Sequence, residues 1–102
     1  MTDSALLQDF LTDQAQLTRR SPQTVYQSRR VASRFLTFLT RQQLTLAQAH
    51  QRGLLARLAV QWLQGIRAAG AKAESLHTYL GKLRAFLDYA VACQQLPENP
   101  MR

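Results

Sequence analysis

Apolar residues recur at helical spacing through most of the 102-residue chain, and no segment shows the two-residue alternation of a half-buried β-strand. Such a chain folds as packed helices, because each helix must bury its apolar stripe against a neighbour. The length suits one small domain, and an apolar content of 46% is enough for a single core. We therefore expect an all-α fold, a compact bundle of four to five helices.

Start and stop signals divide the chain into four helical segments. The second has the clearest start, because Ser21 can accept a bond from a free backbone N–H and Pro22 has no N–H to leave unpaired. Thr45 and Gln48 fit a capping box that opens the third segment, which Gly53 could divide into two. The expected segments are about 3–17, 22–40, 45–69 and 73–94.

The expected core is the set of apolar residues that share a face of each segment. It comprises Leu6, Leu7, Phe10 and Leu17, then Val25, Ala32, Phe35, Leu36 and Leu39, then Leu55, Leu58, Trp62 and Ile66, and finally Leu76, Tyr79, Leu80, Leu83, Phe86, Leu87 and Ala90. We expect the domain to cover 1–96. Residues 97–102 contain two prolines that cannot continue a helix, so we expect an extended exit that begins a linker.

Charge is distributed unevenly along the chain. The stretch from Gln14 to Ala73 holds ten basic residues and no acidic one, within a net charge of +7. Eleven of the thirteen basic residues are Arg, whose planar fork of donors suits phosphates and guanine edges. A field of one sign points to a polyanion as partner. The ten are Arg19, Arg20, Arg29, Arg30, Arg34, Arg41, Arg52, Arg57, Arg67 and Lys72.

Residues for acid–base or nucleophilic chemistry are scarce. Asp9 and Asp13 lie one helical turn apart, which is also what an exposed acidic edge would show. His50 and His77 have no ligand partners at metal-binding spacing, and Cys93 is the only cysteine. We expect no catalytic residue, no metal site and no cofactor. Without a signal peptide or an apolar run of membrane length, we expect a soluble, cytoplasmic protein.

One stripe of the second segment is polar, with residues recurring at steps of 4, 3, 4, 3 and 4. Gln can bond an adenine edge, Arg can bond a guanine edge, and either can hold a phosphate. A solvated face, an acidic protein or a membrane surface remain alternatives, although a membrane would need an exposed apolar face that this helix uses for its core. The stripe is Gln23, Gln27, Arg30, Arg34, Thr37 and Arg41.

A second polar surface lies on the fourth segment. Gly81 and Ala85 are small enough for another backbone to come close, and a mid-helix Gly costs about 1 kcal/mol relative to Ala. Close approach of a partner and simple tolerance both explain Gly81. The other members of this face are Glu74, His77, Thr78, Lys82, Arg84 and Asp88.

Three motifs occur in a familiar order: Ser21-Pro22-Gln23-Thr24, then the run Leu80-Gly81-Lys82-Leu83-Arg84-Ala85-Phe86-Leu87-Asp88-Tyr89, then Glu98-Asn99-Pro100. Together they resemble the N-terminal core-binding (SAM-like) domain of tyrosine recombinases and phage integrases, closest to Xer-type members. The resemblance covers the chain from about Leu6 to Pro100. It implies a helical bundle that clamps a recombination half-site, with the second and fourth helices at the major groove.

Carried over by position, the resemblance implies a set of DNA-facing residues on two helices. Departures from the family pattern are Ser28 and Thr78, where relatives often have Tyr and Arg, and Gly81, where Ser is usual; His77 could supply the contact missing at Thr78. Arg84 could instead be structural, bonding carbonyls or Asp88. The expected DNA-binding residues are Thr24, Gln27, Arg30, Arg34, Arg41, His77, Thr78, Lys82 and Arg84.

The family's catalytic residues lie in a separate C-terminal domain, so the resemblance implies a non-catalytic chain. The expected partners are duplex DNA and, in the full-length protein, the catalytic domain and other protomers; we expect the isolated domain to be monomeric and to act at the bacterial nucleoid. The alternative is a helical protein–protein interaction module with a basic surface.

Overall fold

The computed structural model describes all 102 residues, and its regular elements are all helical. In chain order they are α1 (Asp3–Thr12), a π-helical turn η1 (Asp13–Leu17), α2 (Pro22–Arg41), α3 (Leu46–Gln51), α4 (Leu55–Ala68) and α5 (Ala73–Ala92). The expected all-α bundle is confirmed. No helix combines the length and the apolar character that a membrane crossing requires.

Local side-chain bonds explain where the helices begin. The Ser21 hydroxyl oxygen accepts a hydrogen bond from the Thr24 backbone N–H at 3.2 Å and so caps α2, with Pro22 in the first turn. Thr45 and Gln48 form the expected capping box at α3. Gly53 has a φ of +69°, a left-handed conformation that ends α3 and separates it from α4.

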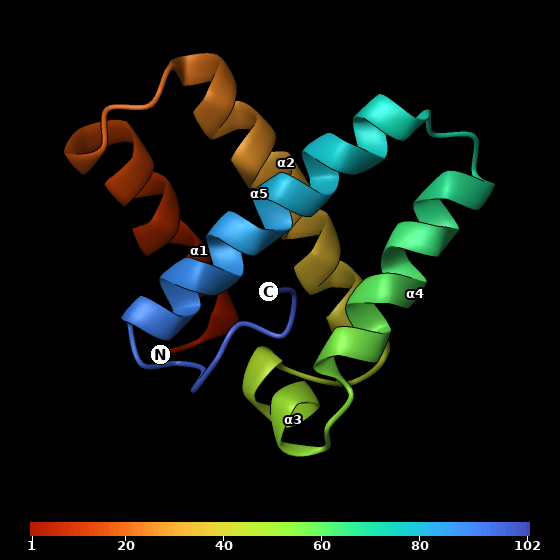
Figure 1. Ribbon diagram of the computed structural model, residues 1–102. Coiled ribbons are helices and arrows are strands. Elements are labelled where there is room, and N and C mark those ends of the chain that lie inside the picture. Colours follow the sequence, from red (N-terminus) through yellow and green to blue (C-terminus); the bar gives the residue numbers. More distant parts are fainter.

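The bundle is built around the crossing of α2 and α5. In Figure 1, α5 crosses α2 near the middle of both helices, α1 and α4 lie on opposite sides of this crossing, and α3 closes one end. Aromatic side chains join the long helices in pairs. The ring centroid of Phe10 on α1 lies 5.4 Å from that of Phe86 on α5, and that of Phe35 on α2 lies 5.3 Å from that of Trp62 on α4. Phe35 and Phe86 are fully buried. This core fixes how the polar faces of α2 and α5 are oriented.

The prediction that Leu17 joins the core is wrong, because its side chain is 78% exposed. The Thr18 backbone N–H bonds the Asp13 carbonyl, five residues earlier, at 2.9 Å. This wider turn moves later residues off the apolar face. Gln14 takes the inward place and is 7% exposed, whereas Leu11, which the apolar pattern did not single out, is buried.

The segment after α5 is bent rather than extended. The helix ends at Ala92, and Leu96 is buried with the core. The chain then turns back, so that its C-terminal end lies below the α2–α5 crossing in Figure 1. The expectation of an extended exit is wrong because side chains of α5 bind this segment, as described below.

Candidate functional site

The basic side chains of α2 have no acidic partners. Arg30 and Arg34 are exposed and Gln27 is half-buried. The structure contains one ion pair, between Arg102 and Asp88, so every other Lys and Arg is more than 4.0 Å from a carboxylate oxygen. These guanidinium groups keep donors free for an external anion.

Arg34 is the point where α2 and α5 meet through polar atoms. Its Nη1 donates a hydrogen bond of 3.2 Å to the Tyr79 hydroxyl oxygen. Tyr79 is half-buried, with its ring centroid 6.1 Å from that of Trp62. Tyr79 therefore holds one nitrogen of Arg34 and leaves the other donors of the guanidinium available.

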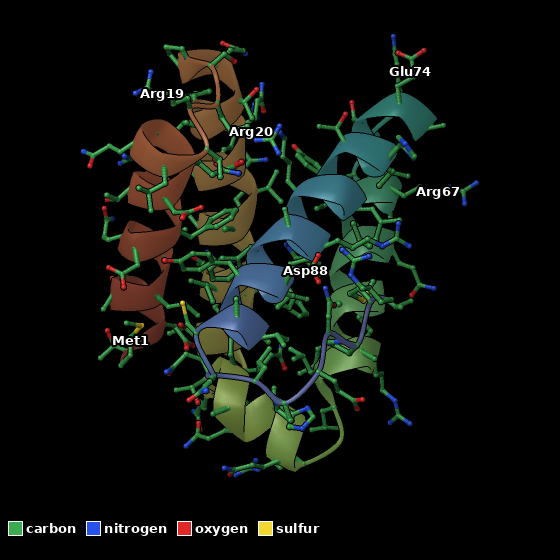
Figure 2. All side chains as sticks on the ribbon, turned by 60° about the vertical axis from the view of Figure 1, so that its left-hand side comes forward. Met1, Arg19, Arg20, Arg67, Glu74 and Asp88 are labelled. Atoms are coloured by element: carbon green, nitrogen blue, oxygen red, sulfur yellow. The ribbon has the colours of Figure 1, made fainter.

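Polar side chains from three elements surround an open hollow of about 450 Å³, here called the η1–α2–α5 hollow. It brings together four of the expected DNA-binding residues and adds two that were not in that set, Gln14 and Arg20. In Figure 2, Arg19 and Arg20 lie at the end of the molecule where α2 begins. The polar residues of the hollow are Gln14, Arg20, Thr24, His77, Thr78 and Lys82.

Small residues complete the wall that α5 gives to this hollow. They are Gly81 and Ala85. A Cβ atom placed on Gly81 would meet no atom within 4 Å, so packing inside the protein does not require glycine here. The hollow is wider because both residues are small.

Arg84 is exposed, and one of its donors binds the C-terminal segment. Its Nε donates to the Met101 carbonyl oxygen at 2.9 Å, while its own carbonyl accepts from the Asn99 side-chain amide at 3.1 Å. The structural alternative for Arg84, bonding carbonyls, is what the structure shows. It does not bond Asp88.

Asp88 is the acceptor that holds the same segment. It accepts bonds from the Asn99 Nδ2 and the Arg102 Nε, both at 2.8 Å, and pairs with the Arg102 guanidinium. The hydrogen bond from Arg102, with a further one from Asn99, lowers the pKa of Asp88 to about 2 against the opposing effect of burial. We call these four residues, Arg84, Asp88, Asn99 and Arg102, the tail clasp.

Two positions named from the sequence lie away from this region or inside the core. Arg41 is exposed in the last turn of α2, where a cation also offsets the helix dipole. Ser28 is buried, and its hydroxyl oxygen has no hydrogen-bond partner. Ser28, one of the departures from the pattern of the family that the sequence resembles, is therefore a core position here.

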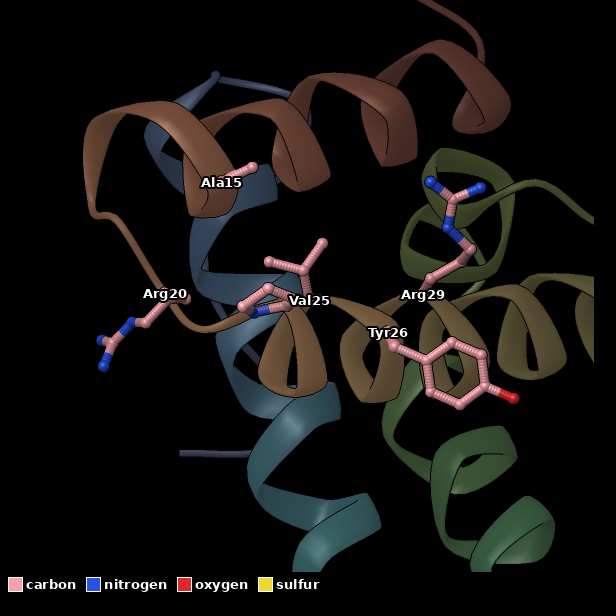
Figure 3. Close-up of a pocket in the computed structure, with 6 residues that line it drawn as sticks. Ala15, Arg20, Val25, Tyr26 and Arg29 are labelled. Atoms are coloured by element: carbon pink, nitrogen blue, oxygen red, sulfur yellow. The ribbon is translucent and has the colours of Figure 1, made fainter.

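Two further depressions lie beside the same helices. One, of about 640 Å³, lies between η1 and α2, and Figure 3 shows the guanidinium groups of Arg20 and Arg29 pointing apart rather than converging on it. Tyr26 is exposed at its edge. The other is an apolar groove between α4 and α5 formed mainly by Val60, Leu63, Ala73, Leu76 and Leu80. Neither gathers the predicted residues.

Titratable groups elsewhere form no cluster of metal ligands, since no three His, Cys, Asp or Glu side chains come together. Tyr89 is half-buried near the end of α5. Burial, followed by the neighbouring Cys93 and the carboxylates of Asp9 and Asp13, raises its pKa to about 12. Its phenol is therefore protonated at neutral pH.

Comparison with protein-family models, with curated proteins and with solved structures finds no match to this chain.

Proposed function

We propose that this chain is a non-catalytic DNA-binding domain that holds duplex DNA with α2 and the N-terminal half of α5. The observation that carries the proposal is that the cations of α2 have no carboxylate partners in a protein of net charge +7. Free guanidinium groups on one helix face neutralise phosphates, which supply most of the affinity for DNA. Arg30 and Arg34 are the residues on which binding depends most.

The shape of α2 suits this role. The helix has 20 residues and is therefore about 30 Å long, and a major groove of about 12 Å width admits a helix. Phosphate contacts fix such a helix in place, and base edges give limited selectivity. Gln27 and Arg30 are the residues with the chemistry to bond adenine and guanine edges.

The more specific proposal is a core-binding domain of a tyrosine site-specific recombinase, which clamps a recombination half-site for DNA integration or recombination. Its support is the order of the three sequence motifs that contain Ser21-Pro22, Leu80–Tyr89 and Asn99-Pro100. Two of them contribute to the surface, since Thr24 and Lys82 line the same hollow. In the whole protein its partners are then the catalytic domain and other protomers, in the bacterial cytoplasm.

A salt titration tests DNA binding directly. If about five phosphates are neutralised, log K plotted against log salt has a slope of roughly −4 to −5. Fluorescence anisotropy with several duplexes at increasing salt measures it. A flat titration, or no binding at low salt, contradicts the proposal.

The alternative function is a helical protein–protein interaction module. The apolar groove between α4 and α5 favours it, because Val60 on its edge is 45% exposed. Sedimentation with and without DNA separates the two candidates. Self-association without DNA favours the interaction module, whereas a monomer that sediments faster only with DNA favours the DNA-binding domain.

A further inference from the structure

We infer that the η1–α2–α5 hollow seats a single phosphate group, and that its occupant is one phosphodiester of the DNA backbone. This inference rests on the proposed DNA binding for the source of the phosphate. The hollow itself is defined by side chains from η1, α2 and α5 and by the turn before α2. A group held there is fixed relative to both DNA-facing helices at once.

The charge of the hollow is of one sign. Arg20 and Lys82 line it, no carboxylate does, and neither cation has an ion-pair partner within the protein. Lys82 is half-buried, so its carbon chain packs on the protein while the ammonium group remains available. An anion is the ligand that two unpaired cations in one depression bind.

Hydroxyl groups add donors in the same place. The Thr24 oxygen accepts the hydroxyl hydrogen of Ser21 at 3.0 Å, which leaves the hydrogen of Thr24 free to donate. Thr78 lines the hollow from α5. A phosphate oxygen between α2 and α5 accepts bonds of this kind together with the charged ones.

Gln14 is the residue that internal packing does not explain. It is 93% buried, it lines the hollow, and its amide oxygen has no hydrogen-bond partner. An apolar side chain would suit that inward position without leaving a polar atom unpaired. The amide can turn about its last side-chain bond and present its two N–H donors to an anion. With the amide turned in this way, a bound phosphate oxygen accepts hydrogen bonds from the Gln14 N–H groups.

Space for the ligand comes from α5. Gly81 exposes backbone where other residues would place a side chain, and a Cβ there meets nothing in the free protein. The opening at this point is thus available to a group from outside. A phosphate oxygen can approach the helix surface beside Ala85.

The first test uses inorganic phosphate alone and nuclear magnetic resonance. We expect the side-chain amide signals of Gln14 and the backbone signal of Gly81 to shift with phosphate, and not with sodium chloride at equal ionic strength. Gln14→Leu keeps the net charge and should remove the Gly81 shift without lowering the melting temperature. Shifts that are the same with chloride, or that persist in Gln14→Leu, contradict the inference.

The second test asks whether the phosphate belongs to DNA. The double variant Arg20→Gln/Lys82→Gln should reduce the magnitude of the salt slope by about 1, because the hollow holds one phosphate and a lost phosphate contact lowers the slope by about 1. Arg52→Gln/Arg57→Gln removes the same charge from the C-cap of α3 and from α4, outside the hollow, and should leave the slope unchanged.

The outcomes separate the hollow from the proposed function. Wild-type DNA binding with an unchanged slope in Arg20→Gln/Lys82→Gln overturns the inference and leaves DNA binding intact. Phosphate-dependent signal shifts without any binding to duplexes overturn the claim that the phosphate belongs to DNA, and they identify a site for free phosphate esters. A specific phosphate shift together with the reduced slope supports the inference as stated.

Discussion

Helices α2 and α5 have the same length and cross at the centre of the bundle, yet their polar faces are used differently. Arg30 and Arg34 on α2 have no carboxylate partner, and a single neutral hydroxyl group restrains Arg34. On α5, Arg84 is bound to the backbone of the C-terminal segment and Asp88 is saturated with donors. The presence of a basic residue on a helix therefore does not by itself give that helix the capacity to bind an external anion.

The difference divides α5 into two halves. The half from His77 to Lys82 faces the η1–α2–α5 hollow, whereas the half that holds Arg84 and Asp88 supports the tail clasp. The clasp also cancels the one carboxylate of that half, because Arg102 pairs with Asp88. A partner that approaches α2 and the first half of α5 thus meets basic side chains, and Glu74 in the first turn of α5 is the only carboxylate on these two segments.

The largest predicted effect concerns α2. Arg30→Ala/Arg34→Ala should weaken duplex binding by about 2 kcal/mol or more, roughly thirtyfold, because two unpaired guanidinium groups lose their phosphates or bases. The melting temperature should change little, since both side chains are exposed and the only hydrogen bond lost is the one from Arg34 to the Tyr79 hydroxyl oxygen. Anisotropy titrations and thermal unfolding measure the two quantities.

The matched control removes the same charge from another surface. Arg52→Ala/Arg57→Ala should retain DNA affinity to within a few fold. Equal losses in both double variants would mean that total charge decides binding, and the contrast between α2 and the rest of the surface would then be wrong.

The next effect separates the contribution of Gly81 to DNA binding from its contribution to the stability of α5. Gly81→Ala should stabilise the fold by about 1 kcal/mol, because Ala favours a helix over Gly and the added Cβ meets no atom. Duplex affinity should fall, since the methyl group narrows the hollow. Denaturant unfolding and a DNA titration test both parts, and a stabilised variant with undiminished affinity would show that nothing approaches this face.

Arg84 should behave unlike the arginines of α2. Arg84→Ala removes the hydrogen bond to the Met101 carbonyl and should lower the free energy of unfolding by about 1 kcal/mol. We expect a smaller loss of DNA affinity than in Arg34→Ala. Undiminished stability combined with abolished binding would place Arg84 in the same class as Arg34.

Helix positions, caps and the all-α fold were predictable because they depend on neighbours in sequence. Ser21, Pro22 and the capping box of Thr45 act within four residues, and each works as expected. The exposure of Leu17 was not predictable, because the π-helical turn changes the register within one turn. A polar residue four positions after Phe10, Gln14, was the only local sign of that change.

The candidate site was predictable in part. Thr24, Thr78 and Lys82 were selected by their positions in the family that the sequence resembles, and the fold brings them to one hollow. Arg20 was counted in the basic stretch but not among the expected DNA-binding residues, because it belongs to a connecting turn, whose direction helical periodicity does not determine. The bond of Arg84 to Met101 joins residues seventeen positions apart and depends on how the chain turns after Leu96, which local patterns do not encode.

Ser28→Ala tests the buried side of α2. Its hydroxyl group is buried without a partner, so its removal should raise stability by up to about 1 kcal/mol. DNA binding should not change, because the residue does not reach the surface. A destabilised variant would mean that the hydroxyl group has a partner, such as a bound water. Weaker DNA binding would mean that Ser28 contributes to the DNA interface.

The smallest effect is the pH dependence of the tail clasp. The hydrogen bond from Arg102 lowers the folded pKa of Asp88 to about 2, below an unfolded value of about 3.9. The clasp should therefore stabilise the fold fully above the unfolded value, and this contribution should disappear as the pH falls from about 4 through 2.

Water and salt screen this pair, because the side chains of Asp88 and Arg102 are 34% and 66% exposed. The stability difference between the wild type and Asp88→Asn isolates it from the other carboxylates of the chain. We expect this difference to be largest near neutral pH, to shrink below pH 4 and to decrease with added salt. A difference that is constant from neutral pH to pH 2 would mean that neutral hydrogen bonds, such as the one from Asn99, hold the C-terminal segment against α5, and that the ion pair contributes nothing.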